Sequence, residues 1–196
     1  DEFVKEMKQY DCRLIPIIDA GVKIEKGYAI YEEGVENNYF CKKEDGTDFI
    51  AAVWPGYTHF PDVLNKEARK WFGSKYRILT EKGIEGFWND MNEPAIFYTP
   101  EGIERIKNHM KKFVEKQPSK NDVWFMKNEM LYLANHSSDY ASFYHNVDGQ
   151  KIRHDKVHNL YGYNMTRAAA EGLNEIDSNR RYLLFSRSSY IGMHRY

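Results

Sequence analysis

Long apolar runs and net charge are both scarce in this chain of 196 residues. No apolar stretch approaches the roughly 20 residues that a membrane helix needs, and the N-terminus lacks the basic and apolar regions of a signal peptide. The 28 Lys and Arg residues balance 29 Asp and Glu residues, so no net field draws the chain to nucleic acid or an anionic membrane. We therefore expect a neutral partner, and neither a nucleic acid nor a membrane.

Cysteines and phosphate-binding turns are also few. Cys12 and Cys41 are too few for a disulfide framework and are not spaced as metal ligands. This favours a reducing compartment, and we expect a cytoplasmic protein that needs no metal. No glycine-rich turn such as GxGxxG or GxxxxGK[ST] follows an apolar strand. No nucleotide or other cofactor is therefore expected.

Aromatic residues, in contrast, are plentiful. They make up 15% of the chain, with 15 Tyr and 4 Trp, and many stand beside polar residues rather than in apolar runs. Such amphipathic rings suit the apolar faces and hydroxyl edges of sugars, but they suit ordinary protein cores equally well. Composition thus allows a sugar site without requiring one.

Strand-like and helix-like segments alternate along the chain. Three apolar runs have the length of a buried strand: 12–19, 84–90 and 181–189. Helical spacing of apolar residues marks three other segments: 3–7, 68–82 and 158–176. The alternation is typical of repeated β and α units on a parallel sheet.

Two α/β folds fit this pattern, an open doubly wound sheet and a closed (β/α)8 TIM barrel. The strings "IID", "WND" and "SRS" each place a polar residue at the end of a separate apolar run, which is where barrel enzymes build their active sites. We therefore favour the barrel. A whole barrel takes about 250 residues, so we expect a partial segment that associates with the remainder of its parent polypeptide. Open strand edges predict that the chain alone associates, for example as a homo-oligomer, or unfolds.

Two excursions interrupt the predicted barrel. Residues 1–98 are expected to form its central part, with a polar, Tyr-rich excursion at 23–48 that contains a hairpin around "EDGTD". The run 49–56 is either the second arm of that hairpin or a strand that returns to the core. Residues 99–153 lose the pattern and are predicted to be an inserted loop or subdomain, beginning with an amphipathic helix. The barrel continues in 154–196.

The stretch "GFWNDMNEP" resembles the nucleophile signature of glycoside hydrolase family 31, the α-glucosidases and their relatives. That signature is a tryptophan, any residue, and then Asp-Met-Asn-Glu, here Trp88 to Glu93. The stretches "LIPIIDAG", "VWPGYTHFPD" and "LFSRSSYIGMHRY" resemble further family motifs in the same order. The family has proline where Ala20 stands, which frees one φ angle. Four motifs across residues 14–196 make the resemblance specific.

The resemblance implies a retaining, exo-acting α-glucosidase that removes terminal glucose from α-linked gluco-oligosaccharides. Such chemistry uses one ionised carboxylate that attacks C1 of the sugar and one protonated carboxyl that protonates the leaving oxygen. Asp90 is the expected nucleophile, since a short side chain at a strand end is held firmly, and Glu93 is a supporting residue. The family's proton donor is expected beyond residue 196, so this chain alone should be inactive.

The same resemblance predicts the residues that contact the sugar. Trp54, Trp88 and Met91 are expected to line the sugar pocket. Arg187 is expected to hold sugar hydroxyls and to keep the nearby nucleophile ionised. Ile18 and Asp19, at the end of the first strand, complete the predicted set.

Simpler interpretations exist for these residues. The polar residues of "WNDMN" are able to cap a helix, Arg187 to form a structural ion pair, and the tryptophans to fill a core. His154 and His158 have the i, i+4 spacing of metal ligands on a helix. No third ligand is apparent, so we interpret them as solvated or capping histidines.

Alternative functions also stay open. An α-xylosidase, an α-transglucosylase or a lyase of the same family would share the nucleophile motif. The aromatic content also fits a non-catalytic carbohydrate-binding module. A metal-dependent phosphate-transfer enzyme, with Asp90 and Glu93 as Mg²⁺ ligands, is a third class. No basic or glycine-rich segment supports the last of these.

Overall fold

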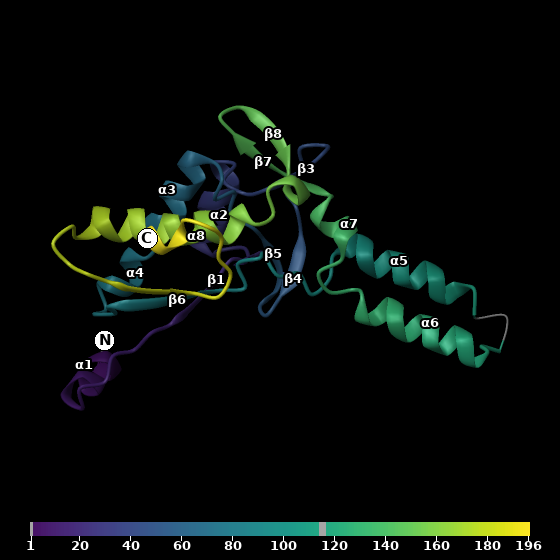
Figure 1. Ribbon diagram of the computed structural model, residues 1–196, viewed down its shortest axis with the longest axis horizontal. Helices are drawn as coiled ribbons and strands as arrows, with labels where there is room; N and C mark the ends of the chain where they lie inside the picture. The colour runs from purple at the N-terminus through teal and green to yellow at the C-terminus, as the bar shows by residue number, and fades with distance from the viewer. Residues whose placement is uncertain (1, 114–116) are drawn as a thin grey trace.

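A parallel three-stranded sheet forms the centre of the fold in this computed structural model, which describes residues 2–113 and 117–196 (Figure 1). Its order is β1 (Ile17–Asp19), β6 (Gly86–Asp90) and β9 (Leu183–Ser186). The register sets Asp19 beside Asp90, and Asn89 beside Ser186. The described residues form no closed barrel. Three parallel strands joined through helices are what a partial barrel segment should show.

Three helices cover one face of this sheet. They are α3 (Lys66–Ser74), α4 (Arg77–Thr80) and α8 (Leu160–Ile176). Glycines let α3 and α8 touch, because a Cβ on Gly73 or on Gly172 would lie 2.2 Å from a backbone oxygen of the other helix. The single helix expected over 68–82 is wrong, since the chain breaks into α3 and α4. The break lets the hydroxyl of Tyr76 reach the sheet at Asn89.

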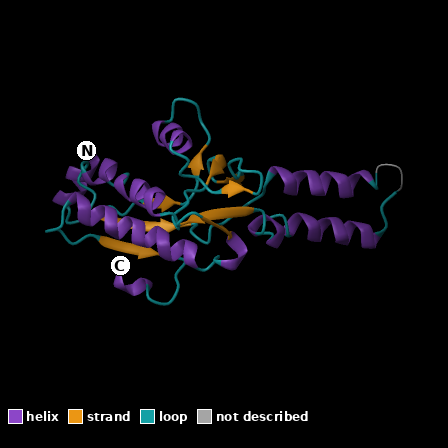
Figure 2. Cartoon of the chain, turned by 90° about the horizontal axis from the view of Figure 1, so that it is seen from above, coloured by secondary structure: helices purple, strands orange, loops and turns teal. Residues whose placement is uncertain are grey.

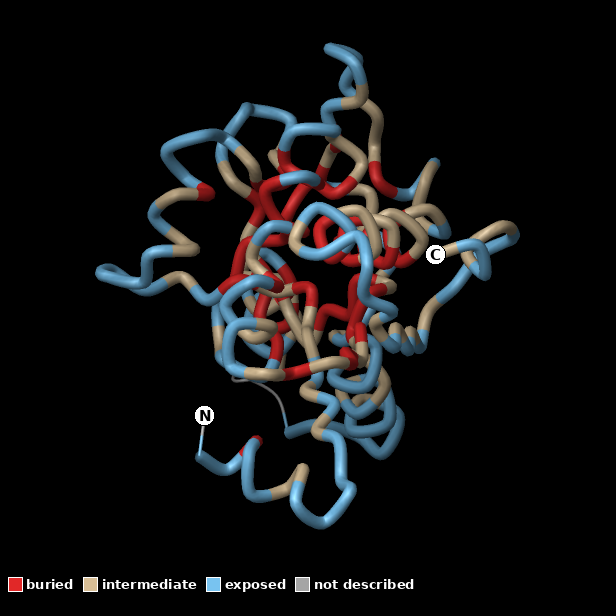
Figure 3. Tube along the Cα trace, turned by 90° about the vertical axis from the view of Figure 1, so that its left-hand side faces the viewer, coloured by how far each residue is buried: buried red, intermediate tan, exposed pale blue. Residues whose placement is uncertain are grey.

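The opposite face of the sheet is open. Ile17 is 52% exposed and Phe185 is 55% exposed, although both belong to runs that we expected to form buried strands. No helix or strand among the described residues covers this side, and the buried segments gather at the centre of the molecule (Figure 3). The sequence therefore predicted the positions of these strands correctly, but it was wrong about the burial of this face.

A second sheet lies beside the first. It is antiparallel, in the order β2 (Val22–Lys23), β5 (Gly56–His59) and β4 (Ala51–Val53), and α2 (Ala29–Glu36) precedes β4 in the chain. The run 49–56 therefore does not pair with the "EDGTD" arm as its main partner. It forms a hairpin with β5 through a tight turn at Trp54 and Pro55, and Gly56 takes the positive φ of 95° that follows this turn.

The predicted excursion and the predicted insertion meet in a third sheet. β3 (Lys42–Lys43) pairs with β7 (Phe143–Val147), which pairs with β8 (Gln150–Arg153). The helix expected at the start of the insertion is present as α5 (Pro100–Lys111), and Thr99 caps it. Residues 114–116, within the predicted insertion, and residue 1 lie outside the described residues.

The predicted insertion also contains a helix that the sequence did not predict. α6 (Lys120–Leu131) runs beside α5, and the pair projects from the body as an arm (Figure 2). A capping box at Ser119 and Asp122 starts α6. The remaining short elements are α1 (Glu2–Gln9), α7 (Ser137–Tyr140), η1 (His154–Lys156) and η2 (Met193–Arg195). Over the described part of the chain, no helix combines the length and apolar character that a membrane crossing needs.

Candidate active site

Asp90 is the last residue of β6, the central strand of the parallel sheet. Side chains alternate along a strand, so Asp90 shares a face with Trp88 and lies on the opposite face from Phe87 and Asn89. Phe87 and Asn89 are fully buried against the helices. Asp90 therefore points to the open side of the sheet at its carboxyl edge, the position at which barrel enzymes carry their chemistry.

Arg187 joins the two carboxylates of the motif. It follows β9, and its backbone N–H donates to the carbonyl of Asn89 at 3.1 Å. Its Nε donates to Oδ1 of Asp90, and its Nη1 and Nη2 donate to the two oxygens of Glu93. The hydrogen bond with Asp90 and the neighbouring negative charges raise the pKa of Arg187. One guanidinium thus fixes both carboxylates by charge-assisted hydrogen bonds.

The two carboxylates are not equivalent. Both oxygens of Glu93 accept from Arg187. Asp90 accepts through Oδ1 alone, and its Oδ2 has no hydrogen-bond partner among residues 2–113 and 117–196. Neither side chain caps a helix here. Asp90 is the carboxylate with an oxygen free to react.

Asp19 belongs to the same electrostatic cluster. It ends β1, directly beside Asp90 in the register. Burial raises the pKa of Asp19, the negative charge of Asp90 raises it further, and the positive charge of Arg187 lowers it. Asp19, which the sequence predicted as a sugar contact, therefore lies at the edge of the sheet that also carries Asp90 and Arg187.

The loop after Asp90 is held in an unusual conformation. Met91 has a positive φ of 54°, which costs a residue with a side chain roughly 1–2 kcal/mol. Its sulfur lies 3.6 Å from Nη2 of Arg187. Such strained positions cluster at functional sites, where the surroundings determine them.

Asn92 fastens this loop to the strand next to it. Its side chain is buried, donates to Oγ of Ser186 at 2.9 Å and accepts from the backbone N–H of Ser188 at 3.2 Å. A Cβ on Gly162 of α8 would lie 2.8 Å from the carbonyl oxygen of Asn92, so only glycine fits there. The motif "DMNE" contains Asn92, but sequence reasoning assigned this residue no role beyond capping.

A second polar residue supports the strand from behind. The fully buried side chain of Asn89 accepts a hydrogen bond of 2.5 Å from the hydroxyl of Tyr76. Burial raises the pKa of Tyr76 far above its ordinary value, so the hydroxyl stays a donor. Sequence reasoning missed this pair, because nothing in the local pattern shows that the break between α3 and α4 brings Tyr76 to β6.

A cavity of about 330 Å³ opens beside the charged cluster. Glu93 and Arg187 form one wall, and His158, which precedes α8, and Gly162, in the first turn of α8, form another. Its lining is mainly polar. His158 was not among the predicted site residues.

The tryptophans take different positions. Trp54 lies at the β4–β5 turn, is 74% exposed and meets the ring of Phe97 edge-on at 4.9 Å. Trp88 lies on the open face with its ring 5.5 Å from that of Phe185. Its indole N–H is buried without a partner among the described residues. Neither ring belongs to the helix-side core of the described residues.

Ile18 lies on the other side of its strand. It alternates with Asp19 and packs against the core, in an apolar cavity of about 270 Å³ that is also lined by Tyr76 and Leu79. This cavity is on the helix side of the sheet, because the register pairs Ile18 with the buried Asn89. The geometry gives the sugar contact predicted for Ile18 no support.

The interpretation of His154 as a solvated or capping residue is wrong. His154 is fully buried, and its two ring nitrogens bond to His145 at 2.9 Å and to His158 at 2.8 Å. It lies in η1 rather than on a long helix. The i, i+4 spacing does bring the two rings together, but as hydrogen-bond partners of each other.

Cys41, Asp62 and His145 bring donor atoms within 4.8 Å of one another. Oδ1 of Asp62 and Nδ1 of His145 lie 2.6 Å apart, whereas two ligands of a tetrahedral zinc ion stand about 3.3 Å apart at ordinary bond lengths. The pair is therefore spaced as a hydrogen bond. Cys12 and Cys41 are both free thiols.

Comparison with known proteins agrees with this architecture. The sequence profile described as "Glycosyl hydrolases family 31 TIM-barrel domain" matches residues 1–196. The chain is 33% identical to "Alpha-glucosidase 2" of Bacillus thermoamyloliquefaciens and 27% identical to "Alpha-glucosidase" of Saccharolobus solfataricus, each over 195 residues. All of this chain is covered, but only 20% and 25% of those relatives, so it spans about a fifth to a quarter of their length.

Solved structures show the same fold. A Flavobacterium johnsoniae GH31 dextranase complexed with glucose superposes with a TM-score of 0.68 at 18% identity, over 100% of this chain and 19% of that one. A family 31 α-glucosidase from Bacteroides thetaiotaomicron gives a TM-score of 0.62 at 24% identity, over 98% of this chain and 24% of that one. The profile match over the whole chain and the strand-end cluster lead to one conclusion: the chain belongs to glycoside hydrolase family 31, as a partial segment of its TIM-barrel domain.

Proposed function

We propose that this chain carries the nucleophile side of a retaining, exo-acting α-glucosidase. Its substrates would be α-linked gluco-oligosaccharides with a non-reducing terminal glucose. The observation that carries the proposal is Asp90, which stands at the carboxyl end of the central parallel strand with Arg187 on one oxygen and the other oxygen free. The family and its α-glucosidase relatives support glycoside hydrolysis as the chemistry.

Asp90 would attack C1 of the terminal glucose through Oδ2, as the bond from C1 to the leaving oxygen breaks. The resulting glycosyl ester would then be opened by water, with retention of configuration. Arg187 supports this role because its guanidinium binds Oδ1 of Asp90 by a charge-assisted hydrogen bond and holds the carboxylate in place. Glu93 would hold Arg187 in place from the other side.

A second carboxyl must protonate the leaving oxygen. Glu93 suits that task poorly, since both of its oxygens accept hydrogen bonds from Arg187. Burial raises the pKa of Asp19, as would suit a proton donor, but Asp19 lies directly beside Asp90 at the same edge of the sheet. We therefore keep the proton donor in a part of the protein beyond residue 196.

The direct test uses the full-length protein. Incubation with a fluorinated glucosyl donor slows the second step and traps the ester, and mass spectrometry of a digest locates the label. We expect the label on the peptide that contains Asp90. A label on Glu93, Asp19 or another carboxylate would overturn the assignment.

Activity assays on the full-length protein distinguish an α-glucosidase from the other activities considered. Turnover of an aryl α-glucoside against an aryl α-xyloside distinguishes a glucosidase from a xylosidase, and addition of a second sugar as acceptor reveals transglucosylation. A non-catalytic carbohydrate-binding module would bind the sugar and form no labelled peptide.

A further inference from the structure

A chain of four hydrogen-bonded side chains runs from the buried interior to the cavity beside Glu93. Oδ1 of Asp62 lies 2.6 Å from Nδ1 of His145, whose Nε2 lies 2.9 Å from Nδ1 of His154. Nε2 of His154 lies 2.8 Å from Nδ1 of His158, which lines the cavity. The first three residues are buried and the last is half-buried. No part of the proposed mechanism uses this chain.

The hydrogen bonds between these four side chains all donate in one direction, and Asp62 determines that direction. Oδ2 of Asp62 accepts from the backbone N–H of Asn146 at 2.7 Å, and a backbone nitrogen can only donate. A carboxylate accepts hydrogen bonds on both of its oxygens. Nδ1 of His145 must then carry the hydrogen that Oδ1 accepts.

The remaining tautomers follow from the first. A neutral imidazole has one donor and one acceptor nitrogen, so Nε2 of His145 accepts from Nδ1–H of His154. Nε2 of His154 in turn accepts from Nδ1–H of His158. Nε2 of His158 is left as a bare lone pair, and it has no hydrogen-bond partner within the described ranges.

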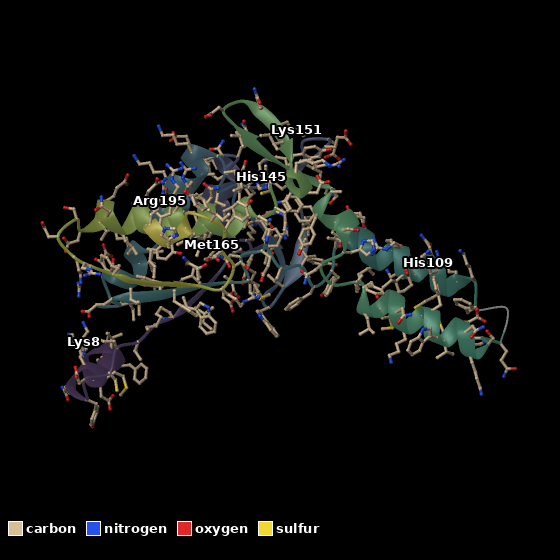
Figure 4. All side chains as sticks on the ribbon, in the orientation of Figure 1. Lys8, His109, His145, Lys151, Met165 and Arg195 are labelled. Carbon is tan, nitrogen blue, oxygen red and sulfur yellow. The ribbon has the colours of Figure 1, made fainter. Side chains whose placement is uncertain are left out.

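Burial keeps the rings of His154 and His158 neutral, and neighbouring aromatic rings pack against them. Burial lowers the pKa of His154 to about 2, and burial also lowers the pKa of His158. The ring of Phe143 stacks on His154 at 4.2 Å, and the ring of Tyr140 packs against His158 at 4.6 Å. The hydroxyl of Tyr140 donates to the carbonyl of Pro94, directly after Glu93. His145, labelled in Figure 4, comes from β7 of the inserted segment.

We propose that Asp62, His145 and His154 are positioning residues that hold His158 with hydrogen on Nδ1, so that its Nε2 faces the cavity beside Glu93 as an acceptor for a substrate hydroxyl. The identity of that ligand as a sugar rests on the proposed function. The tautomer itself depends on the four side chains, on the Asn146 N–H and on the Cys41 thiol, whose Sγ lies 3.6 Å from Nδ1 of His145.

Asp62→Asn tests the direction of the chain. The backbone N–H of Asn146 still needs an acceptor, so the amide oxygen must face it and the amide NH₂ must face Nδ1 of His145. Nδ1 then accepts, and the hydrogens on all three histidines move to Nε2. His158 would present an N–H to the cavity in place of a lone pair, with almost no change in shape.

The experiment is NMR of the full-length protein labelled with ¹⁵N in histidine, which distinguishes a protonated ring nitrogen from a bare one. We expect Nδ1–H on His145, His154 and His158 in the wild type, and Nε2–H on all three in Asp62→Asn. Asp139→Asn, a buried carboxylate outside the chain that accepts from Thr99, is the matched control and should leave the wild-type tautomers unchanged. Single His→Gln variants assign the signals.

Several outcomes would overturn the proposal. Nε2–H on His158 in the wild type would do so without reference to any variant, and so would a stoichiometric metal ion bound to His145. For binding, we expect the affinity for glucose to fall about tenfold in Asp62→Asn, since a donor replaces an acceptor. Unchanged affinity with inverted tautomers would remove the substrate contact from His158. Loss of catalysis alone tests the proposed function and leaves the tautomers as measured.

Discussion

The two faces of the parallel sheet differ sharply, although the same strands make both. Phe87 and Asn89 on one face are fully buried under α3, α4 and α8. Ile17 and Phe185 on the other face are about half exposed, and the charged cluster of Asp90 and Arg187 stands at its edge. The helix-covered face contains buried core residues, and we propose that the chemistry takes place at the edge of the open face. In a TIM barrel, one face of each strand packs against the ring of helices, the other face lines the barrel interior, and the active site lies at the carboxyl ends of the strands.

The largest expected effect concerns the open face. Asp90→Asn keeps the size of the side chain and removes the nucleophilic charge, so hydrolysis of an aryl α-glucoside by the full-length protein should fall by about 10³-fold or more. Steady-state kinetics measure this loss.

The control for that loss is Asp148→Asn. Asp148 is exposed in the β7–β8 turn at a φ of 50°, a conformation that asparagine also tolerates. The activity of the Asp148→Asn variant should stay at the wild-type level. An active Asp90→Asn enzyme would place the chemistry elsewhere and break the comparison between the faces.

The next effect compares two phenylalanines on the neighbouring strands β6 and β9. Phe87→Ala removes a fully buried ring from the helix-covered face and should lower the free energy of unfolding by about 3–5 kcal/mol. Phe185→Ala alters the open face. In the full-length protein we expect a similar loss, because we propose that the rest of the barrel covers Phe185. Denaturant unfolding of both variants gives the two numbers.

A small loss for Phe185→Ala in the full-length protein, beside a large one for Phe87→Ala, would contradict this expectation. It would mean that the open face stays in contact with water when the protein is whole. The two faces would then differ in every form of the protein, and not only in the chain described here.

The smallest effect is electrostatic. The pKa of Asp19 is raised above that of an unfolded aspartate, chiefly by burial and then by the charge of Asp90. The folded state therefore binds this proton more tightly, and stability falls as pH rises from the ordinary carboxyl pKa to the raised one. Asp19→Asn should abolish this part of the pH dependence and be slightly more stable than the wild type at pH 7.

Asp155→Asn serves as the control for this measurement, because the contribution of Asp155 to the pH dependence of stability has the opposite sign. A hydrogen bond from Arg153 lowers the pKa of Asp155, so its contribution to stability is present near pH 7 and is lost as pH falls through the lowered pKa. Thermal unfolding across the acid range measures both. If stability changed with pH equally steeply in the wild type and in Asp19→Asn, Asp19 would not interact with the charged cluster as proposed.

The sequence predicted the strands of the parallel sheet well, because each is a short apolar run that ends in a polar residue. It failed on α6, where Trp124, Phe125 and Leu131 are exposed and keep no helical period that points to a core. It also failed at the break between α3 and α4. At that break Tyr76 contacts Asn89, a residue 13 positions away, and no local pattern records such a contact.

The site divides in the same way. The sequence by itself determined the family, the nucleophile candidate Asp90 and the charged partner Arg187, since each belongs to a motif of consecutive residues. Their roles stay predictions, as does the division of the chain into barrel and insertion. Only the tertiary structure decided that Ile18 faces the helices, that Asn92 fastens two loops and that His154 is buried between two other histidines. These facts depend on contacts between segments far apart in the chain, and a hydrogen bond across 80 or more residues, such as that from His145 to Asp62, leaves no local trace in a sequence.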